Sequence, residues 1–229
     1  MYANGPRIVT DGLVLCLDAA NRKSYPLSGS TIYDLSGNGN NGTFGPSTSA
    51  PTLSGDNGGV LSFDGNDDYV DCGNNLSLSF VNNLTIQVWC SSNISDSGYR
   101  SPLMKTTSSA WNDGFGFYQQ GGNFYFYVNI WNGAHIVSIS KTTFSLTNFV
   151  GTYDGANLKI YENGILRSTG TSFTANVSNS STNLQVGRGG GSDYEWNGNI
   201  AQVSIYNRAL TAQEIQQNYN ALKGRYGLT

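Results

Sequence analysis

The sequence predicts an all-β fold, a two-sheet antiparallel sandwich with one short helix near the C-terminus. Short alternating apolar runs recur along the 229 residues, and Gly, Asn, Asp or Ser bounds each run. Hydrophobic residues make up 38% of the chain, enough for a packed core, whereas only 12% are charged. The 29 glycines suit a chain with many tight turns. This combination is typical of β-sandwiches, which reach this length as a single domain.

Eleven segments have the length and alternation of strands. They are Leu13 to Leu17, Val60 to Phe63, Leu84 to Cys90, Phe115 to Gln119, Phe124 to Ile130, Ile136 to Ser140, Phe149 to Tyr153, Leu158 to Glu162, Ile165 to Thr169, Leu184 to Gly187 and Ile200 to Tyr206. We find no internal repeat or linker, so we expect one domain over residues 1–229, with a core over about 12–219 and a tail over 220–229. The Ser-, Gly- and Asn-rich tracts 47–59 and 178–183 are expected to be long surface loops.

Two dipeptides predict tight turns between neighbouring strands. Asn163-Gly164 separates KIYE from ILRS, and both residue types tolerate the positive φ that a two-residue hairpin turn requires. Asp154-Gly155 is the second turn. The segments on either side of Asn163-Gly164 are therefore expected to pair as a hairpin.

One helix is predicted after Leu210. Thr211 and Glu214 have the spacing of a capping box, and Leu210 and Ile215 that of a hydrophobic staple. Gly224 is placed to end the helix. The apolar side chains that share one face are Ile215, Tyr219 and Leu222. This face is expected to pack on the sandwich, so truncation after Asn207 should expose apolar surface.

Charge and hydropathy exclude two classes of partner. The net charge is −3, and the 12 basic residues are scattered rather than gathered into the stripe that binding to phosphates requires. We therefore expect no nucleic-acid partner. No apolar run approaches the length of a membrane span, and MYANGPRIVTDG lacks the apolar core of a signal peptide. We expect no membrane insertion and no secretion signal.

The three cysteines, Cys16, Cys72 and Cys90, each lie within or beside a strand-like apolar run. Their number is odd and their spacing fits no zinc motif, so buried free thiols are favoured over a disulfide.

Paired carboxylates of the kind that cleave glycosidic bonds are missing from the sequence. Such sites hold an acid and a nucleophile on one strand at a fixed separation. The chain has three glutamates, one at a hairpin turn, one in a Gly-rich loop and one in the capping box: Glu162, Glu195 and Glu214. We therefore predict that the protein is not an enzyme.

Four stretches in register point to a known family. They are GLVLCLDAANRKSYP with YDLSGNGNNGTF (12–44), VLSFDGNDDYVDCG (60–73), NFVGTYDGANLKIYENGIL (148–166), and LQVGRGGG followed by NGNIAQVSIYNRALTAQEI (184–215). In this order they resemble the laminin-G-like, concanavalin A-like lectin and glucanase family. The resemblance implies a jelly-roll sandwich used mostly for binding. It covers roughly residues 12–219.

A narrower resemblance concerns both ends of the chain. LDAANRKSYP and YDLSGNGNNG near the start, with NYNALKGRYGL near the end, are similar to segments in structural proteins of tailed, particularly marine, bacteriophages. The resemblance implies a virion location after synthesis in the host cytoplasm, as a capsid decoration or a tail or fibre component. Its implied partners are other virion or surface proteins, and an oligomer is compatible with the sequence.

Calcium is the candidate ion. Carboxylate, amide and carbonyl oxygens, which Ca²⁺ prefers, cluster in DLSGNGNNG (34–42) and DGNDDYVD (64–71). The preferred ligands are Asp34 and Asn40 in the first loop and Asp67 and Asp68 in the second. Family resemblance implies a calcium near a sheet edge. The alternative is open, because both motifs also suit turns without a metal.

The aromatic strand NFYFYVNIW is the candidate carbohydrate-binding site. Alternation places Phe124, Phe126, Val128 and Ile130 toward the core and the intervening side chains outward. The predicted carbohydrate-binding residues are the outward set together with Trp111: Tyr125, Tyr127, Asn129, Trp131 and Trp111. Rings could stack on a pyranose while the amide binds its hydroxyls. A protein interface or plain packing explains the same rings, and both interpretations stay open.

Two functional hypotheses follow. The first is a non-catalytic structural or interaction protein, displayed on a virion and possessing a fold able to adhere to glycans. The second is a calcium-dependent carbohydrate-binding module that recognises cell-surface polysaccharide. They differ in whether the isolated chain binds sugar and in whether it occurs stoichiometrically in a particle.

Overall fold

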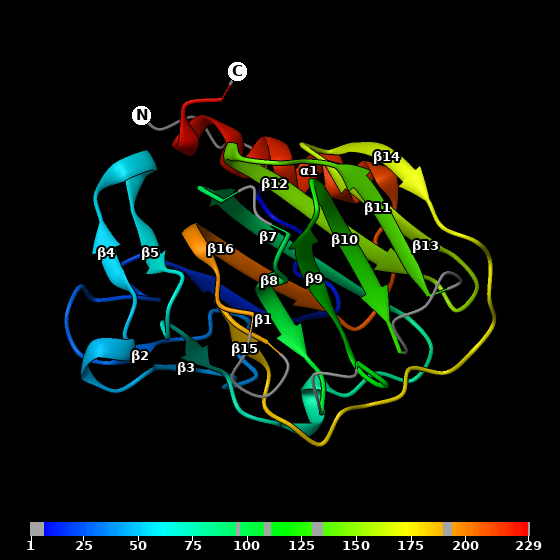
Figure 1. The fold of residues 1–229 in the computed structure, drawn as a ribbon, viewed down its shortest axis with the longest axis horizontal. Coiled ribbons are helices and arrows are strands. Elements are labelled where there is room, and N and C mark those ends of the chain that lie inside the picture. Colours follow the sequence, from blue (N-terminus) through cyan, green and yellow to red (C-terminus); the bar gives the residue numbers. More distant parts are fainter. Residues whose placement is uncertain (1–6, 95–96, 108–110, 130–134, 190–193, 229) are drawn as a thin grey trace.

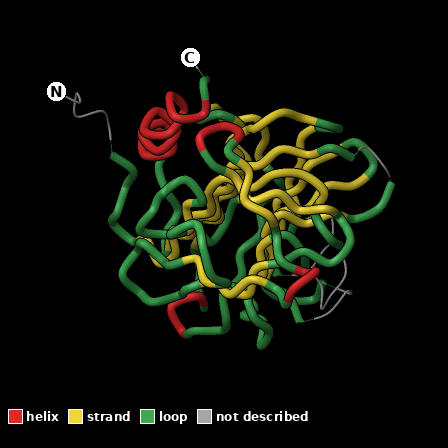
Figure 2. Tube along the Cα trace, turned by 90° about the vertical axis from the view of Figure 1, so that its left-hand side faces the viewer, coloured by secondary structure: helices red, strands yellow, loops and turns green. Residues whose placement is uncertain are grey.

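The computed structural model describes residues 7–94, 97–107, 111–129, 135–189 and 194–228. Its strands form two eight-stranded sheets in which every pair is antiparallel. The sheets lie face to face, and helix α1 (Ala212–Leu222) lies outside them (Figures 1 and 2). The predicted all-β antiparallel sandwich with a short C-terminal helix is therefore confirmed.

The first sheet has the order β14-β13-β12-β7-β16-β5-β4, and β1 also pairs with β16. Its strands are β1 (Leu13–Asp18), β4 (Thr52–Ser54), β5 (Val60–Asp64), β7 (Leu84–Ser92), β12 (Phe144–Tyr153), β13 (Leu158–Glu162), β14 (Ile165–Thr169) and β16 (Asn197–Tyr206). Strand β7 is buried at every position because it lies between β12 and β16 and is covered on both faces. This sheet carries helix α1 on its outer face (Figure 1).

The second sheet has the order β11-β10-β9-β8-β15-β6-β3-β2. Its strands are β2 (Thr31–Ile32), β3 (Gly42–Phe44), β6 (Val70–Asp71), β8 (Arg100–Lys105), β9 (Phe115–Gln120), β10 (Asn123–Val128), β11 (Ile136–Ser140) and β15 (Gln185–Val186). The strands from β8 to β11 are the longer ones, and they present the broad outer face on which the candidate site lies.

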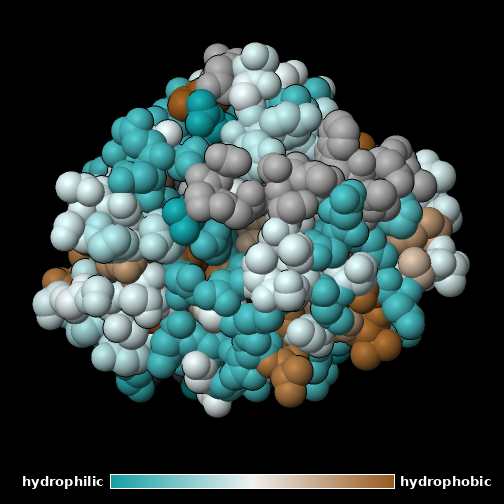
Figure 3. All heavy atoms as spheres, turned by 60° about the horizontal axis from the view of Figure 1, so that its bottom comes forward, coloured by the Kyte–Doolittle hydropathy of each residue, from teal (hydrophilic) through white to brown (hydrophobic). Residues whose placement is uncertain are grey.

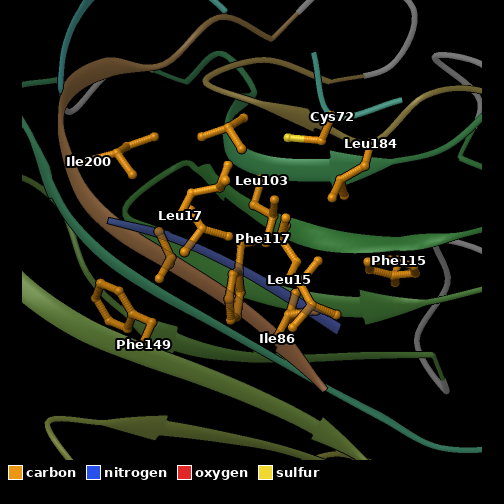
Figure 4. Close-up of a cluster of buried hydrophobic side chains, with 14 of the residues drawn as sticks. Leu15, Leu17, Cys72, Ile86, Leu103, Phe115, Phe117, Phe149, Leu184 and Ile200 are labelled. Atoms are coloured by element: carbon orange, nitrogen blue, oxygen red, sulfur yellow. The ribbon is translucent and has the colours of Figure 1, made fainter. Parts of the chain in front are cut away.

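The largest apolar cluster fills the space between the sheets. Leu15, Ile86 and Phe149 enter it from the first sheet, and Leu103 and Phe117 from the second (Figure 4). Burial of each such side chain contributes about 1.5–3 kcal/mol to stability. The inward side chains of both sheets therefore form the core between them, and the alternate side chains lie on the outer faces of the sandwich.

Five strands were not predicted from the sequence. Strands β2, β3, β4 and β6 have two or three residues each, too few for alternation to be recognised. The tract 47–59, expected to be a surface loop, contains β4 and two short 3₁₀ turns, Ser47–Ser49 and Asp56–Gly58. Strand β8 contains Pro102 and ends at the buried Lys105, and these residue types hide its alternation.

The predicted hairpin at Asn163-Gly164 is confirmed. It joins β13 to β14, with φ of 50° at Asn163 and 80° at Gly164. Positive φ at both central residues is the geometry of a type I′ turn, which matches the twist of paired strands.

Replacing Gly164 by Val is expected to destabilise the fold, because a β-branched residue at positive φ costs about 1–3 kcal/mol. For a chain of this size, Tm should fall by about 2–12 °C in a thermal melt. Gly55→Val is the matched control, because Gly55 has φ of −75° and an added Cβ there meets nothing within 4 Å. Equal Tm values for the two variants would contradict the assigned turn strain.

Helix α1 begins as predicted but ends differently. The capping box is present, with the Thr211 hydroxyl accepting from the Glu214 amide and the Glu214 carboxylate accepting from the Thr211 amide. The predicted stop at Gly224 is wrong. The α-helix ends at Leu222, the chain continues as a 3₁₀ turn over Lys223–Tyr226, and the left-handed residue is Gly227, with φ of 71°. The apolar segment therefore extends past residue 219.

Both parts of this C-terminal segment pack on Trp89, which faces outward from β7. Tyr219 lies parallel to the indole at a centroid distance of 5.6 Å, and Tyr226 lies 4.6 Å from it. Leu222 belongs to the same apolar cluster. The predicted packing of the helix on the sandwich is therefore confirmed.

All three cysteines are buried free thiols, as predicted. Burial raises the pKa of Cys16 to about 11, and burial also raises the pKa values of Cys72 and Cys90. All three are therefore neutral at physiological pH.

Candidate binding surface

The outer face of the second sheet carries a cluster of aromatic side chains. Strands β9 and β10 are antiparallel, and Tyr118 is paired with Tyr125. Phe124 and Phe126 enter the core as predicted, whereas Tyr125 and Tyr127 lie on the opposite face. The predicted division of this strand into an inner and an outer face is confirmed for these residues.

Three rings form a buried layer against this outer face: Trp111, Tyr118 and Tyr127. Trp111 stacks on Tyr127 at a centroid distance of 5.3 Å, and its ring meets Tyr118 edge to face at 4.5 Å. Tyr118 and Tyr127 are fully buried and Trp111 is 3% exposed. Such close packing of large rings fixes each orientation.

Three further tyrosines lie over the buried layer and are only half-buried: Tyr99, Tyr125 and Tyr194. Tyr125 is parallel to Tyr118, with centroids 4.4 Å apart and an angle of 2° between the planes. Tyr99 and Tyr194 each meet Trp111 edge to face at 5.3 Å. We call the six rings of both layers the aromatic cluster. Its half-buried tyrosines keep accessible surface on a rigid base.

This layering changes the role of two predicted sugar contacts. Trp111 and Tyr127 have no ring face accessible to a ligand, because other rings and the sheet cover them. They support the accessible tyrosines instead. Trp131 lies outside the described residues. Of the predicted aromatic contacts, Tyr125 is the one that the described part of the chain leaves accessible.

Asn129 is used within the fold. Its side chain is 7% exposed, its Nδ2 donates to the Asn176 carbonyl at 2.8 Å, and its Oδ1 accepts from the Ser178 amide at 2.6 Å. The amide therefore fastens the segment 176–178 beside the end of β10. Because both polar atoms of its side-chain amide are hydrogen-bonded within the fold, Asn129 is a poor candidate for contact with a ligand.

Polar side chains flank Tyr125 on the same face. The register places Ser138 of β11 opposite Tyr125, and Ser140 opposite Asn123, which lies two residues before Tyr125. Gln120 of β9 pairs with Asn123. Among these residues, Gln120, Asn123 and Ser138 are partly exposed and Ser140 is exposed. Amides and hydroxyls beside a ring are the groups that recognise sugars.

A second group of interest is the carboxylate cluster, which we define as Asp64, Asp67 and Asp68. One carboxylate oxygen from each lies within 4.8 Å of the others. Oxygen atoms at this separation can share one Ca²⁺, whose bonds to oxygen are about 2.3–2.6 Å long. The sequence predicted Asp67 and Asp68 but not Asp64, although Asp64 begins the same DGNDD motif.

The charges in the carboxylate cluster are not equivalent. Burial, together with the charges of Asp64 and Asp67, raises the pKa of Asp68, whose Oδ2 accepts from the Asp64 amide at 2.9 Å. Hydrogen bonds from the side chain and backbone of Asn66 lower the pKa of Asp64. Asp67 accepts from the Ser49 hydroxyl at 2.7 Å. A bound cation would relieve the repulsion felt by Asp68.

The other two predicted calcium ligands lie elsewhere, in the loop after β2. The Asp34 carboxylate accepts from the amides of Cys16 at 2.9 Å and Asn40 at 3.1 Å. Asn40 is buried, and its Nδ2 donates to the Val14 carbonyl at 2.7 Å. Asp34 is not a member of the carboxylate cluster. The structure thus brings Asp34 and Asn40 together as the hydrogen-bonded frame of their own loop.

Two of the three glutamates are held in ion pairs. Glu162 pairs with Lys141 and Arg167. Glu214 binds Arg208 through both carboxylate oxygens, at 2.9 and 2.7 Å, and this pairing lowers the pKa of Glu214 to about 2. Arg208 also pairs with Asp11 at 2.9 Å, so it holds two carboxylates.

Sequence reasoning missed Tyr99 and Tyr194. Tyr99 precedes β8 and Tyr194 precedes β16, so neither belongs to an alternating run. No sequence signal marks them, because only the folded chain brings these connecting segments onto Trp111.

The face of the molecule shown in Figure 3 is mostly hydrophilic, with hydrophobic side chains in a few separate areas. In the described part of the chain, no helix is both long enough and apolar enough to span a membrane.

Comparisons with known proteins agree with this architecture. A family model described as "Concanavalin A-like lectin/glucanases superfamily" matches residues 64–216. Among curated proteins, no sequence matches significantly. Many solved structures have a similar fold.

Three of the similar structures are informative. The binding domain of Paraclostridial Mosquitocidal Protein 1 matches with a TM-score of 0.69 and 16% identity, over 96% of this chain and 56% of that one. Domain 4 of AbnA, an extracellular arabinanase from Geobacillus stearothermophilus in complex with arabinotriose, has a TM-score of 0.66 and 16% identity, over 90% and 98%. Trypanosoma rangeli sialidase with the inhibitor DANA has a TM-score of 0.66 and 14% identity, over 93% and 33%. The chain thus spans just over half of the toxin binding domain and nearly all of the arabinanase domain.

Proposed function

Since this chain belongs to the concanavalin A-like lectin/glucanases superfamily, we propose that it is a non-catalytic domain that binds carbohydrate on the outer face of its second sheet. The observation that carries the proposal is Tyr125, half-buried, lying flat on the buried Tyr118 and flanked by amides and hydroxyls. The arabinanase domain, which is of similar extent and whose structure is in complex with arabinotriose, supports a binding role.

The face around Tyr125 suits a sugar because its ring and its polar groups are held in place before a ligand binds. A sugar presents C–H groups on its ring faces and hydroxyls at its edges, so it needs a ring to stack on and hydrogen-bonding groups beside that ring. Tyr125 supplies the ring, and Gln120, Asn123 and Ser138 supply the polar groups. The buried layer fixes Tyr125 before the ligand arrives, which reduces the entropy lost on binding.

We propose no catalytic role for this chain, because hydrolysis of a glycosidic bond needs two carboxyl groups across one cleft. Glu162 and Glu214 are held in ion pairs instead. A sialidase is among the similar structures, but this chain spans 33% of it. The fold alone therefore gives no argument for catalysis.

Replacing Tyr125 by Ala is expected to weaken sugar binding about 30-fold, the loss typical of removing an aromatic anchor from an interface. A glycan array would first identify a ligand, and titration calorimetry would then compare the wild type with the variant. Tyr33→Ala is the matched control, because Tyr33 is an exposed tyrosine away from β10. Unchanged affinity in Tyr125→Ala, or the same loss in both variants, would overturn the proposed site.

Calcium is proposed as an accessory ion, held by Asp64, Asp67 and Asp68. Support comes from the separation of their oxygens and the mutual repulsion of their charges. If the ion binds the folded state, CaCl₂ should raise Tm and EDTA should reverse the rise. Asp67→Asn should abolish this response, whereas Asp56→Asn, an exposed carboxylate of another loop, should not.

Asp34 and Asn40, also predicted as ligands, remain the alternative calcium site. A calcium response that survives Asp67→Asn but disappears in Asp34→Asn would move the ion to that loop. Absence of any response in the wild type would refute a calcium site in either place.

A second candidate function is display on a virion, where the chain would contact other virion or surface proteins. Sequence segments near both ends support it, through their similarity to structural proteins of tailed phages. The test is quantitative mass spectrometry of purified particles, in which a structural component occurs at a fixed ratio to the major capsid protein. A decorating domain could also bind glycans, so the two functions are compatible.

A further inference from the structure

A polar cleft of about 580 Å³ lies at one end of the first sheet, away from the residues assigned above. It forms where β7 ends and where β12 and β16 begin, toward the upper left of Figure 1. The residues that line it are Ser91, Ser92, Asn93, Thr143, Phe144, Ser145, Leu146 and Asn199. None of these eight side chains carries a charge, so the cleft suits an uncharged ligand.

Irregular strand pairing opens the cleft. The register between β12 and β7 shifts between Phe144, which pairs with Ser92, and Thr147, which pairs with Cys90. Such a bulge bends the strand and leaves extra backbone unpaired. On the other side, the Asn199 amide donates to the Ser91 hydroxyl at 3.1 Å. The Asn93 amide donates to the Asn197 carbonyl at 3.1 Å, so the ends of β7 and β16 stay joined, and the irregular pairing beside the cleft is that of β12 with β7.

One buried side chain holds two walls of the cleft in place. Gln119 of β9 is 4% exposed, and its Oε1 accepts from the Ser92 hydroxyl at 2.6 Å. Its Nε2 donates to the carbonyls of Ile94 at 3.1 Å and Thr142 at 2.7 Å. Gln119 thus ties the segment after β7 to the segment before β12. The cleft is fixed before any ligand binds.

Inside the cleft, an aromatic surface lies beside uncommitted polar groups. The Phe144 ring is partly exposed and is held from behind by Phe149 at 5.2 Å and Trp196 at 6.2 Å. The side-chain amides of Asn93 and Asn199 make no hydrogen bond within the described structure, and the two residues are exposed and half-buried, respectively. Each free amide offers both a donor and an acceptor.

We propose that this cleft binds one uncharged sugar unit, as a second carbohydrate contact separate from the face of Tyr125. The Phe144 ring would contact a sugar face, and the Asn93 and Asn199 amides would bind its hydroxyls. The ligand class follows from an uncharged lining that combines one ring with amides and hydroxyls. This inference rests on the proposed carbohydrate-binding function and adds a site to it.

The experiment is NMR titration of the ¹⁵N-labelled chain with uncharged trisaccharides: arabinotriose, maltotriose, cellotriose and laminaritriose. The side-chain amide signals of Asn93 and Asn199 are expected to shift saturably with at least one of them. The variant Asn93→Ala/Asn199→Ala is expected to bind that sugar about tenfold more weakly at this site. Asn220→Ala, which removes an exposed amide on helix α1, is the matched control.

The outcomes separate the two sites. Shifts of the backbone amide signals of cleft residues that the variant keeps, such as Ser92 and Ser145, that weaken in the double variant but persist in Tyr125→Ala support the cleft. Shifts confined to β9, β10 and β11, and unaffected by the double variant, overturn the cleft and leave the proposed function intact. No shift with any of the four sugars overturns the cleft as a site for uncharged sugars and also counts against the proposed function.

Discussion

A chain truncated after Asn207 is expected not to fold to a stable monomer. The truncation removes apolar side chains that the C-terminal segment packs against the first sheet: Leu210, Ile215, Leu222 and Tyr226. At about 1.5–3 kcal/mol each, their burial contributes about 6–12 kcal/mol, comparable with the total stability of a typical domain. The truncated chain should aggregate or lack a cooperative melting transition.

Truncation would also break buried hydrogen bonds and an ion pair that the C-terminal segment makes with the sandwich. The buried Asn218 accepts from the Val9 amide at 2.7 Å and donates to Tyr206 at 3.0 Å, so it joins the N-terminal segment, β16 and the helix. Arg225 pairs with Asp18 at 2.6 Å. Removing one partner of a buried hydrogen bond leaves the other polar group unsatisfied, which costs more than the bond itself contributes.

Two point variants keep this prediction testable if the truncated chain cannot be purified. Leu222→Ala should lower stability by about 2–5 kcal/mol, as for other buried leucines. Gln213→Ala, on the exposed side of the helix, should leave it unchanged. A soluble truncated chain with the Tm of the full chain would show that the helix is dispensable for the sandwich.

Gly114→Ala is expected to have the second largest effect. Gly114 precedes β9 with φ of +72°, and an added Cβ would lie 1.7 Å from the Lys105 carbonyl oxygen. Left-handed strain of about 1–2 kcal/mol and overpacking of about 1–3 kcal/mol together predict a loss of about 2–5 kcal/mol. The backbone must move here, because the obstructing atom is itself backbone.

The movement caused by Gly114→Ala would also reach the aromatic cluster. The Gly114 carbonyl accepts from the Asn129 amide at 2.7 Å, and Trp111 lies three residues before it. Thermal melts and near-UV circular dichroism should therefore both change. Gly121→Ala is the matched control, because Gly121 also has positive φ, +54°, but no atom lies within 4 Å of its added Cβ. Equal losses in the two variants would show that conformational strain alone, not the steric clash, sets the cost.

The parts of the fold that were predictable are those with local signals. Alternation marked the long strands other than β8, the Asn163-Gly164 pair marked its hairpin, and the capping box at Thr211 marked the start of the helix. Strands such as β3 and β6 were missed because two or three residues contain no period. Their conformation is imposed by neighbouring strands, a tertiary effect that sequence alone does not display.

The sequence predicted which residue types lie on the outer face, but it did not predict how deeply each side chain is buried. Alternation placed Tyr125 and Tyr127 on the outer face, yet it could not show that Trp111 would cover Tyr127. Depth depends on which connecting segments fold over a sheet, and Tyr99 and Tyr194 come from such segments. The same limit applies to calcium, since the DGNDD motif gave oxygen atoms but not the difference in burial between Asp67 and Asp68.

The reaction of the three buried thiols with a thiol reagent can show which part of the folded structure opens. Cys16 lies in β1, Cys72 follows β6 in the second sheet, and Cys90 lies in the central strand β7. A thiol reagent can attack only after the surrounding structure opens, because burial removes access and disfavours the reactive thiolate. Labelling rates of the three positions, resolved by mass spectrometry, would therefore separate fluctuations that release the edge strand β1 from those that expose β7 and so require the whole sandwich to come apart.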